Sequence, residues 1–283
     1  MLTLSKSKIK SLIDCPLKFR FNYIDDPKPE KDTILDDKYL IAGLEIHDRL
    51  DKIYDKIDEQ KYKNMDIIEK IEYLDDLFGD AETENLEANE IINIARKNFI
   101  EYQINLDKEF NKDLAKPYKK ELFAKFIITD NFIKKFIEPR KDSTTGKKIR
   151  NLNPLNEDIL IRGYIDRIDQ FPDNTYGILD YKSKTTSVTI WELSGYMLMA
   201  SIHLNLPEIN KIGCWGYKDS SYFYRPVKVQ NIDYFLFKVL EFKNNYDKYQ
   251  KLGRWPRKRG FMCRFCEWQK LCKKYNSQGE LKK

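Results

Sequence analysis

Five cysteines are placed so that a four-cysteine site that includes Cys15 would bring the two ends of the chain together. Cys263, Cys266 and Cys272 follow a C-x2-C-x5-C spacing, whose first two thiolates can reach one ion. A fourth ligand could come from Cys15 or Cys214. Cys214 lies in an apolar, strand-like run, where a free thiol packs as a small hydrophobe. Cys15 is followed by a proline that ends a short helical stretch, so we predict Cys15 as the fourth ligand.

The cysteine spacing alone leaves the bound group open. Zinc is the ordinary partner of C-x2-C, but zinc ribbons show two close pairs, and here the fourth cysteine stands alone. Four thiolates suit a [4Fe-4S] cluster equally well. The chain starts without the basic head and apolar core of a secretory signal, which predicts a cytoplasmic protein in which disulfides are a poor explanation. Unrelated buried cysteines are the remaining alternative.

Charge is distributed unevenly along the chain. Lys and Arg number 51 against 45 Asp and Glu, but residues 36–110 carry a net charge of −11 and residues 251–283 a net charge of +9. Aromatic side chains interrupt the basic segment, a pattern typical of nucleic-acid binding. A solvated tail, or a tail resting against the acidic helices, is the alternative. The predicted DNA contacts here are Arg254, Trp255, Arg257, Lys258 and Arg259.

The hydrophobic pattern predicts a mixed chain with one sheet flanked by helices, either α/β or α+β. No run approaches the roughly 18 apolar residues of a membrane helix, so the composition excludes a membrane-spanning protein. Residues 138–157 are polar, contain Pro and Gly, and predict a long loop or arm. The expected helices are 5–24 with a proline break, 36–60, 65–110 with a break near Gly79, 188–205 and 231–250; the expected strands are 121–129, 158–171, 176–183 and two within 209–229.

A predicted hairpin carries the candidate catalytic residues. The strand runs 158–171 and 176–183 are separated by a Pro-Asp-Asn-Thr turn signal. Asp180 and Lys182 project to one face of their strand, and Asp166 reaches the same point if the hairpin pairs. Two carboxylates beside a lysine suit Mg²⁺ or Mn²⁺, with the lysine orienting the attacking water and offsetting charge. Solvent-facing charges paired across the strands are the alternative.

Three further residues extend this candidate site. His47 stands at the edge of the apolar face of its helix and could give a ring nitrogen to a metal, or could be a packed core histidine. Glu192 and Tyr196 lie four residues apart, on one face of the helix after the hairpin.

The order of these motifs resembles the iron–sulfur branch of the RecB-like nucleases in the PD-(D/E)XK superfamily, which includes the CRISPR-adaptation nuclease and the AddB-type nuclease domain. Five motifs carry the resemblance: Ser5 to Phe19 resembles the opening S-x-S…C-P segment, Gly43 to His47 the G-x-x-x-H helix, Gly163 to Asp166 the G-x-x-D strand, Asp180 to Lys182 the (D/E)-x-K strand, and Cys263, Cys266 and Cys272 the closing cysteine cluster.

The resemblance implies an α/β restriction-endonuclease-like core, with a central mixed sheet flanked by helices and a cysteine-cluster cap joining the termini. It implies one nuclease domain over residues 1–283, with a helical insertion at about 55–115, a polar arm at about 138–157 and an iron–sulfur-binding segment at 251–283. The implied metal ligands are His47, Asp166, Asp180 and the backbone carbonyl of Tyr181, with Lys182 as catalytic lysine; Cys15, Cys263, Cys266 and Cys272 would hold a [4Fe-4S] cluster rather than zinc.

One motif departs from the family pattern. The family has Q-x-x-x-Y after the lysine, and this chain keeps Tyr196 but has Glu192 in place of Gln. The resemblance implies that Tyr196 and Glu192 contact DNA. A carboxylate cannot donate an amide hydrogen bond to a phosphate or base, so a metal contact is the alternative for Glu192.

The function implied is a metal-dependent DNA nuclease, an exonuclease preferring single-stranded ends in phage or plasmid recombination, repair or DNA processing. CRISPR adaptation is the alternative role, and a non-catalytic iron–sulfur DNA-binding assembly module is the alternative class. No G-x-x-x-x-G-K-[ST] motif is present, so unwinding would need a separate helicase; a recombinase or single-strand-binding protein are the other partners considered.

Overall fold

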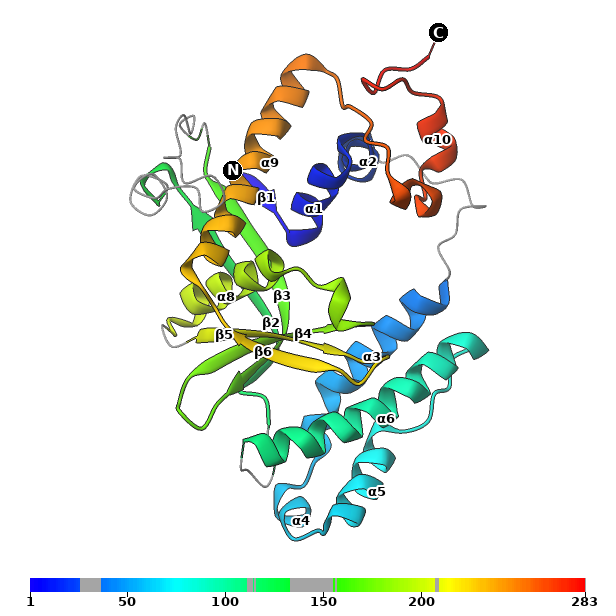
Figure 1. Cartoon of the computed structure of the whole chain (residues 1–283), viewed down its shortest axis with the longest axis vertical. Coiled ribbons are helices and arrows are strands. Elements are labelled where there is room, and N and C mark those ends of the chain that lie inside the picture. The colour runs from blue at the N-terminus through cyan, green and yellow to red at the C-terminus, as the bar shows by residue number, and fades with distance from the viewer. Residues whose placement is uncertain are drawn as a thin grey trace. The chain divides into compact units, whose positions relative to one another are not determined.

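The computed structural model describes residues 1–25, 37–110, 114, 116–132, 155, 157–206 and 209–282. The chain forms two compact units, each assembled from separated segments (Figure 1). Most of the predicted polar arm, 138–157, lies outside the described residues. Unit 1 comprises Met1–Asp36, Phe126–Arg162 and Asp233–Lys283; unit 2 comprises Asp37–Lys125 and Gly163–Ile232.

A six-stranded mixed sheet supplies the framework, which confirms the predicted fold class. Its order is β1-β3-β4-β5-β6, and β2 also pairs with β3. The β1–β3 and β4–β5 pairs are parallel, whereas β3–β4 and β5–β6 are antiparallel. The strands are β1 (Leu2–Leu4), β2 (Lys119–Ile128), β3 (Ile159–Gln170), β4 (Tyr176–Lys182), β5 (Ile209–Gly216) and β6 (Tyr222–Pro226).

The β3–β4 hairpin forms where its turn signal predicted it. Asn174 adopts a left-handed backbone with φ of 59°, and the Phe171 N–H donates to the Thr175 carbonyl at 2.8 Å. The Asp173 carboxylate accepts from the Thr175 N–H at 3.0 Å, the local hydrogen bond that makes aspartate common in turns. The register then pairs Gln170 with Tyr176 and Ile168 with Ile178. The sequence-predicted hairpin therefore forms at the predicted place, and its register is set by the structure.

Helices of unit 2 cover one sheet face through an apolar core. Ile46, Leu50 and Ile53 of α3 are buried in this core, together with Trp215 of β5. α5 is bounded by a capping box at Asp66 and by a glycine with positive φ, which accounts for the predicted break before α6. The described part of the predicted insertion is thus helical. These helices are α3 (Asp37–Lys56), α4 (Glu59–Lys63), α5 (Ile67–Phe78) and α6 (Leu86–Glu109).

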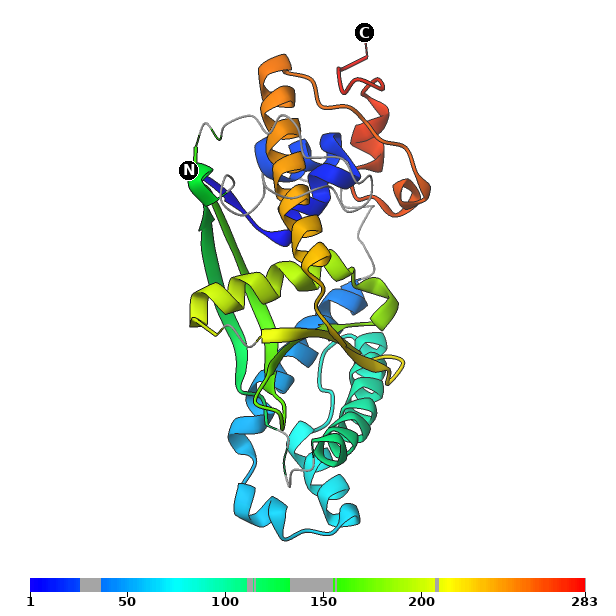
Figure 2. The ribbon, with the colours of Figure 1, turned by 60° about the vertical axis from the view of Figure 1, so that its left-hand side comes forward.

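Helix α8 (Ile190–Leu204) also packs against the strands, on the face away from α3 and α6 (Figure 2), and is preceded by the short 3-10 turn η3 (Thr185–Ser187). Gly163 of β3 lets it approach closely, because a Cβ there would stand 3.3 Å from both Tyr196 and Met199. The glycine of the G-x-x-D motif therefore sets how near Tyr196 can lie to the strand that carries Asp166.

Unit 1 joins helices from both ends of the chain around an aromatic core. The Phe19 ring stacks on Trp255, with ring centroids 5.8 Å apart, and meets Phe242 edge-on. Phe21 contacts Trp268 with ring centroids 5.6 Å apart and ring planes inclined by 53°. Within the described part of the chain, no helix is both long and apolar enough to cross a membrane. The elements are α1 (Lys6–Asp14), α2 (Pro16–Arg20), the π-type turn η1 (Phe21–Asp25), most of α9 (Val229–Leu252), the 3-10 turn η4 (Phe261–Phe265) and α10 (Gln269–Lys273).

Candidate active site and metal centre

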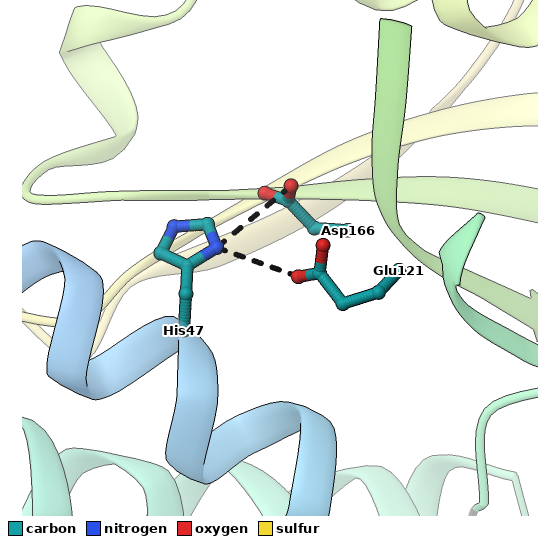
Figure 3. Close-up of side chains that lie close together, drawn as sticks. All are labelled: His47, Glu121 and Asp166. Carbon is teal, nitrogen blue, oxygen red and sulfur yellow. Dashed lines mark ion pairs between the residues drawn. The ribbon is translucent and has the colours of Figure 1, made fainter. Parts of the chain in front are cut away.

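Three side chains from different elements of unit 2 converge on one point (Figure 3). His47 projects from α3, Glu121 from the start of β2, and Asp166 from the middle of β3. The His47 Nδ1 atom lies 3.6 Å from Glu121 Oε1 and 3.9 Å from Asp166 Oδ1. One ligand atom from each residue lies within 4.8 Å of the others. Their convergence brings together three segments that are far apart in the sequence.

The donor set fits a divalent cation. Ligands at ~2.1 Å from an octahedral ion lie ~3 Å apart when adjacent and ~4.2 Å apart when opposite, close to the separations here. Glu121 Oε1 is buried without a hydrogen-bond partner, and an unpaired buried carboxylate oxygen is costly unless a cation satisfies it. Two carboxylates and one imidazole are ligands suited to Mn²⁺ and, through their oxygens, to Mg²⁺.

Glu121 was not predicted as a metal ligand from the sequence. Its φ of 43° lies in the left-handed region, unusual for a non-glycine residue in a strand and costly by about 1–3 kcal/mol. Side chains alternate between the two faces of a strand only where the backbone is extended. The direction of the Glu121 side chain therefore cannot be predicted from alternation. The available signal was a carboxylate at the beginning of an otherwise apolar strand run.

Asp180 and Lys182 of β4 stand beside this centre, as the hairpin predicted. The β3–β4 ladder ends at the pair of Arg167 with Leu179, and one residue further along each strand come Asp166 and Asp180. There Asp166 Oδ2 accepts the Tyr181 backbone N–H at 2.7 Å. Lys182 Nζ lies 2.5 Å from Asp180 Oδ2 and donates to the Tyr181 carbonyl at 3.1 Å. That carbonyl, the predicted fourth metal ligand, is thus held by the lysine.

A buried polar network fixes α3 against β3 on the opposite side of the strand. The Arg167 guanidinium is fully buried and donates to Asp169 at 2.8 Å and to the Tyr54 hydroxyl. Tyr54 in turn donates to Gln103 of α6 at 2.6 Å. Arg167 follows Asp166 directly, and Tyr54 lies two helical turns after His47. The network therefore limits how far the imidazole and the carboxylate can separate.

Burial and like charge set the protonation of the centre. Burial, followed by the nearby Asp180 charge, raises the pKa of Asp166 to about 6, against the opposing effects of His47 and Lys182. Burial alone would lower the pKa of His47, but the Glu121 and Asp166 carboxylates outweigh it and raise that pKa above its ordinary value. A cation that replaces these protons would relieve both perturbations.

We expect metal affinity to fall as the pH drops through about 6. Binding requires unprotonated Asp166 and His47, and the pKa of each is raised, to about 6 for Asp166, so protons compete with the metal increasingly as the pH falls. Calorimetric titration of a Lys182→Ala variant with Mn²⁺ should show a loss of affinity that approaches roughly a hundredfold per pH unit below pH 6, because binding displaces one proton from each of these two ligands. An affinity independent of pH between 5 and 8 would contradict the assignment.

Glu192 and Tyr196 lie on α8, and both are buried. Glu192 Oε2 accepts from the Thr189 N–H at 3.0 Å and from its hydroxyl at 2.8 Å, which forms a capping box at the start of α8. Burial, followed by the Asp180 charge, strongly raises the pKa of Tyr196, so its phenol is neutral. The T-x-x-E spacing predicts such a cap, and it accounts for a glutamate at this position without a DNA contact.

The four predicted cluster cysteines belong to unit 1 and are half-buried, whereas Cys214 is fully buried. Burial raises the pKa of Cys266 and of Cys272, and the Cys15 thiol lies near enough to act on both. Burial likewise raises the pKa of Cys214 to about 12, so that thiol stays neutral. The structure therefore brings the N-terminal cysteine to the C-terminal group.

Hydrogen-bond donors point at the sulfurs of this group. The Gly260 N–H donates to Cys263 Sγ at 3.3 Å, and the Trp268 N–H lowers the pKa of Cys266 against the effect of burial. The Arg257 guanidinium acts in the same way on Cys272, and its Nε is buried without a hydrogen-bond partner. Donors arranged in this manner stabilise thiolates that bind a metal or a cluster.

The basic segment divides between core and surface. Trp255 is 3% exposed, with its ring enclosed by Phe19, Tyr246 and Tyr249, which corrects the prediction that it stacks on a nucleic-acid base. In this part of the basic segment the aromatic ring belongs to the hydrophobic core of unit 1, while cations beside it lie at the surface. The cations are placed as follows: Arg254 pairs with Glu280 at 2.8 Å, Arg257 lies beside Cys272, Lys258 donates to the Ile13 carbonyl at 2.5 Å, and Arg259 is exposed.

Comparison with known proteins gives one family match. Residues 3–273 match the family described as the PD-(D/E)XK nuclease superfamily, so the match covers both units and every residue of the candidate metal centre. No curated protein shows significant similarity to the chain.

Proposed function

Because the chain belongs to the PD-(D/E)XK nuclease superfamily, we propose that it is a divalent-metal-dependent DNA nuclease whose active site is the group His47, Glu121, Asp166, Asp180 and Lys182. The observation that carries the proposal is the convergence of a histidine and two carboxylates beside an Asp–Lys pair at the end of the β3–β4 ladder. This donor set is the one that metal-assisted phosphodiester hydrolysis needs.

Each residue has a distinct role in this proposal. His47, Glu121 and Asp166 would hold Mg²⁺ or Mn²⁺, with Asp180 completing the acidic group. The bound ion supplies charge neutralisation at the scissile phosphate and lowers the pKa of a water molecule. Lys182, held by Asp180 and the Tyr181 carbonyl, is positioned to orient that water or to donate to the phosphate oxygen.

The cysteine group supports a [4Fe-4S] cluster over zinc in unit 1. Sulfurs around one zinc, each at ~2.3 Å, lie ~3.8 Å apart. No three of the four cysteine sulfurs, all within the described residues, lie within 4.8 Å of one another. A cluster, which binds each thiolate to a different iron, spreads its ligands further apart. The four are Cys15, Cys263, Cys266 and Cys272.

Exonuclease action on single-stranded ends, in recombination, repair or CRISPR adaptation, is the finer form of the proposal. It rests on the resemblance of the motifs. The competing class is a non-catalytic DNA-binding assembly module, for which Asp166, Asp180 and Lys182 have no chemical use.

A digestion experiment tests the function directly. Labels at the 5′ or 3′ end of single-stranded and duplex DNA, and circular DNA without ends, separate the possible activities. We expect cleavage in Mg²⁺ or Mn²⁺ and none in chelator, with linear single strands degraded first. Degradation of circular DNA would reject exonuclease action alone. Binding without cleavage in either metal would favour the non-catalytic module.

A further inference from the structure

An exposed aromatic pair stands beside the metal centre on the β2–β3 strands. Phe123 of β2 is 40% exposed and Tyr164 of β3 is 60% exposed, with ring centroids 5.1 Å apart and ring planes inclined by 53°. We propose that this pair is a stacking platform for the unpaired bases of a single-stranded DNA whose phosphate is held at the metal centre. The inference rests on the proposed nuclease function and names the form of its substrate.

Strand geometry places the pair next to the metal ligands. Tyr164 and Asp166 project from the same face of β3, two residues or ~6.6 Å apart along the strand. Phe123 follows Glu121 by two residues on β2, which pairs with β3. Each ring therefore belongs to a residue that lies two positions from a carboxylate of the centre in the same strand.

Burial along β2 shows that the rings belong to an outward face. Ala124 and Phe126 are buried, whereas Phe123 and Lys125 are exposed. In β3 the neighbouring Ile165 is fully buried while Tyr164 is exposed. Single exposed apolar residues are common, but two touching rings on a sheet face beside a candidate phosphodiester site form a specific surface.

The surface matches the chemistry of a single strand. Unpaired bases offer free ring faces to aromatic side chains, whereas bases in a duplex are already stacked on one another. Lys125, exposed on the face that carries Phe123, adds a cation for the adjoining phosphate. The rings would thus hold the bases while the metal centre holds the backbone.

Binding measurements under conditions without cleavage, which compare wild-type and variant protein on three probes, test the proposal. The probes are a fluorescent oligothymidine of about 12 nucleotides, an abasic strand of equal length and a duplex, each titrated by anisotropy in chelator. Wild-type protein should bind oligothymidine on the order of tenfold more tightly than the abasic strand. Phe123→Leu with Tyr164→Leu should remove that difference and leave abasic and duplex affinity unchanged.

Two variants provide matched comparisons. Tyr234→Leu, at a tyrosine of α9 that is 44% exposed and so comparable with Phe123, should keep the preference for bases. Lys125→Gln should keep the preference too, but should reduce the dependence of affinity on salt by about 0.7 in log–log slope, the value for one phosphate contact with a single strand. Mn²⁺ affinity of the double variant serves to verify that the centre is intact.

Several outcomes would overturn the proposal. Equal losses on oligothymidine and abasic strands would mean that the rings do not stack on bases, and an unchanged preference would remove them from the interface. A change in oligomeric state on substitution would identify the pair as a contact between copies of the chain. The assay contains no cleavage step, so a wild-type protein that stacks bases but fails to digest DNA would reject the nuclease function and leave this inference standing.

Discussion

Asp166→Asn is expected to abolish cleavage and, at the same time, to stabilise the metal-free protein. Loss of a ligating carboxylate should reduce turnover by about 10³-fold or more. The stabilisation has a separate origin, since the wild-type carboxylate is buried beside Asp180 and has a pKa of about 6. An amide carries no charge, and its oxygen can still accept the Tyr181 N–H.

The pH dependence of that stabilisation has a definite sign. The folded-state pKa of Asp166 lies above its ordinary value of 3.8, so the proton stabilises the fold fully below pH 3.8 and this contribution is lost as the pH rises through about 6. Wild type and Asp166→Asn should therefore unfold alike near pH 3.8, and the variant should be more stable at pH 7, by about 3 kcal/mol at most. Saturating Mn²⁺ should reverse the order, because only the wild type gains from binding.

Thermal unfolding with and without Mn²⁺, alongside end-labelled digestion, measures both effects. Glu72→Gln, an exposed carboxylate of α5, is the matched control and should change neither. Lys182→Ala should lose activity but keep metal binding. Full activity in Asp166→Asn would remove this residue from the active site.

The second large effect concerns the cysteines. Protein purified without oxygen should be brown and hold roughly four iron atoms per chain. Cys15→Ser should lose the colour and most of the iron, because one thiolate is missing from a group whose other members come from the far end of the sequence. Unit 1 should then become sensitive to protease, while Mn²⁺ binding at the centre in unit 2 persists.

The fifth cysteine offers the control. Cys214 is fully buried in β5, so Cys214→Ala should retain colour and iron. Colourless wild-type protein with one zinc per chain would reject the cluster. Loss of iron in Cys214→Ala but not in Cys15→Ser would reject the choice of the fourth ligand.

Local pattern was enough to predict the hairpin and α3, because a turn signal and a helical period act over a few residues. It was enough to bring Asp166, Asp180 and Lys182 together for the same reason. Glu121 escaped prediction because its backbone leaves the extended region at that residue, so alternation gave no direction for its side chain.

Trp255 shows the opposite error. Its basic neighbours in sequence predicted a surface, but its burial is decided by Phe19, more than two hundred residues away, and by α9. For Glu192 the sequence held a local signal, because Thr189 three residues earlier forms a capping box with it, and its role toward DNA or metal stays a prediction. Local sequence pattern could not predict the burial of Trp255, because this depends on packing against distant residues. The T-x-x-E spacing that predicts the cap at Glu192 is present in the sequence.

The division of the chain into interleaved segments also sets an order of assembly during synthesis. Unit 2 ends at Ile232, so every residue of the metal centre has left the ribosome before the last segment of unit 1, Asp233–Lys283, is translated. Domains fold as units once their residues are available. Cys263, Cys266 and Cys272 arrive only with that segment. The nascent chain can thus complete the unit that holds the metal centre while Cys15 still lacks these three thiols, and any group that the four cysteines bind together would be taken up after unit 2 has been translated.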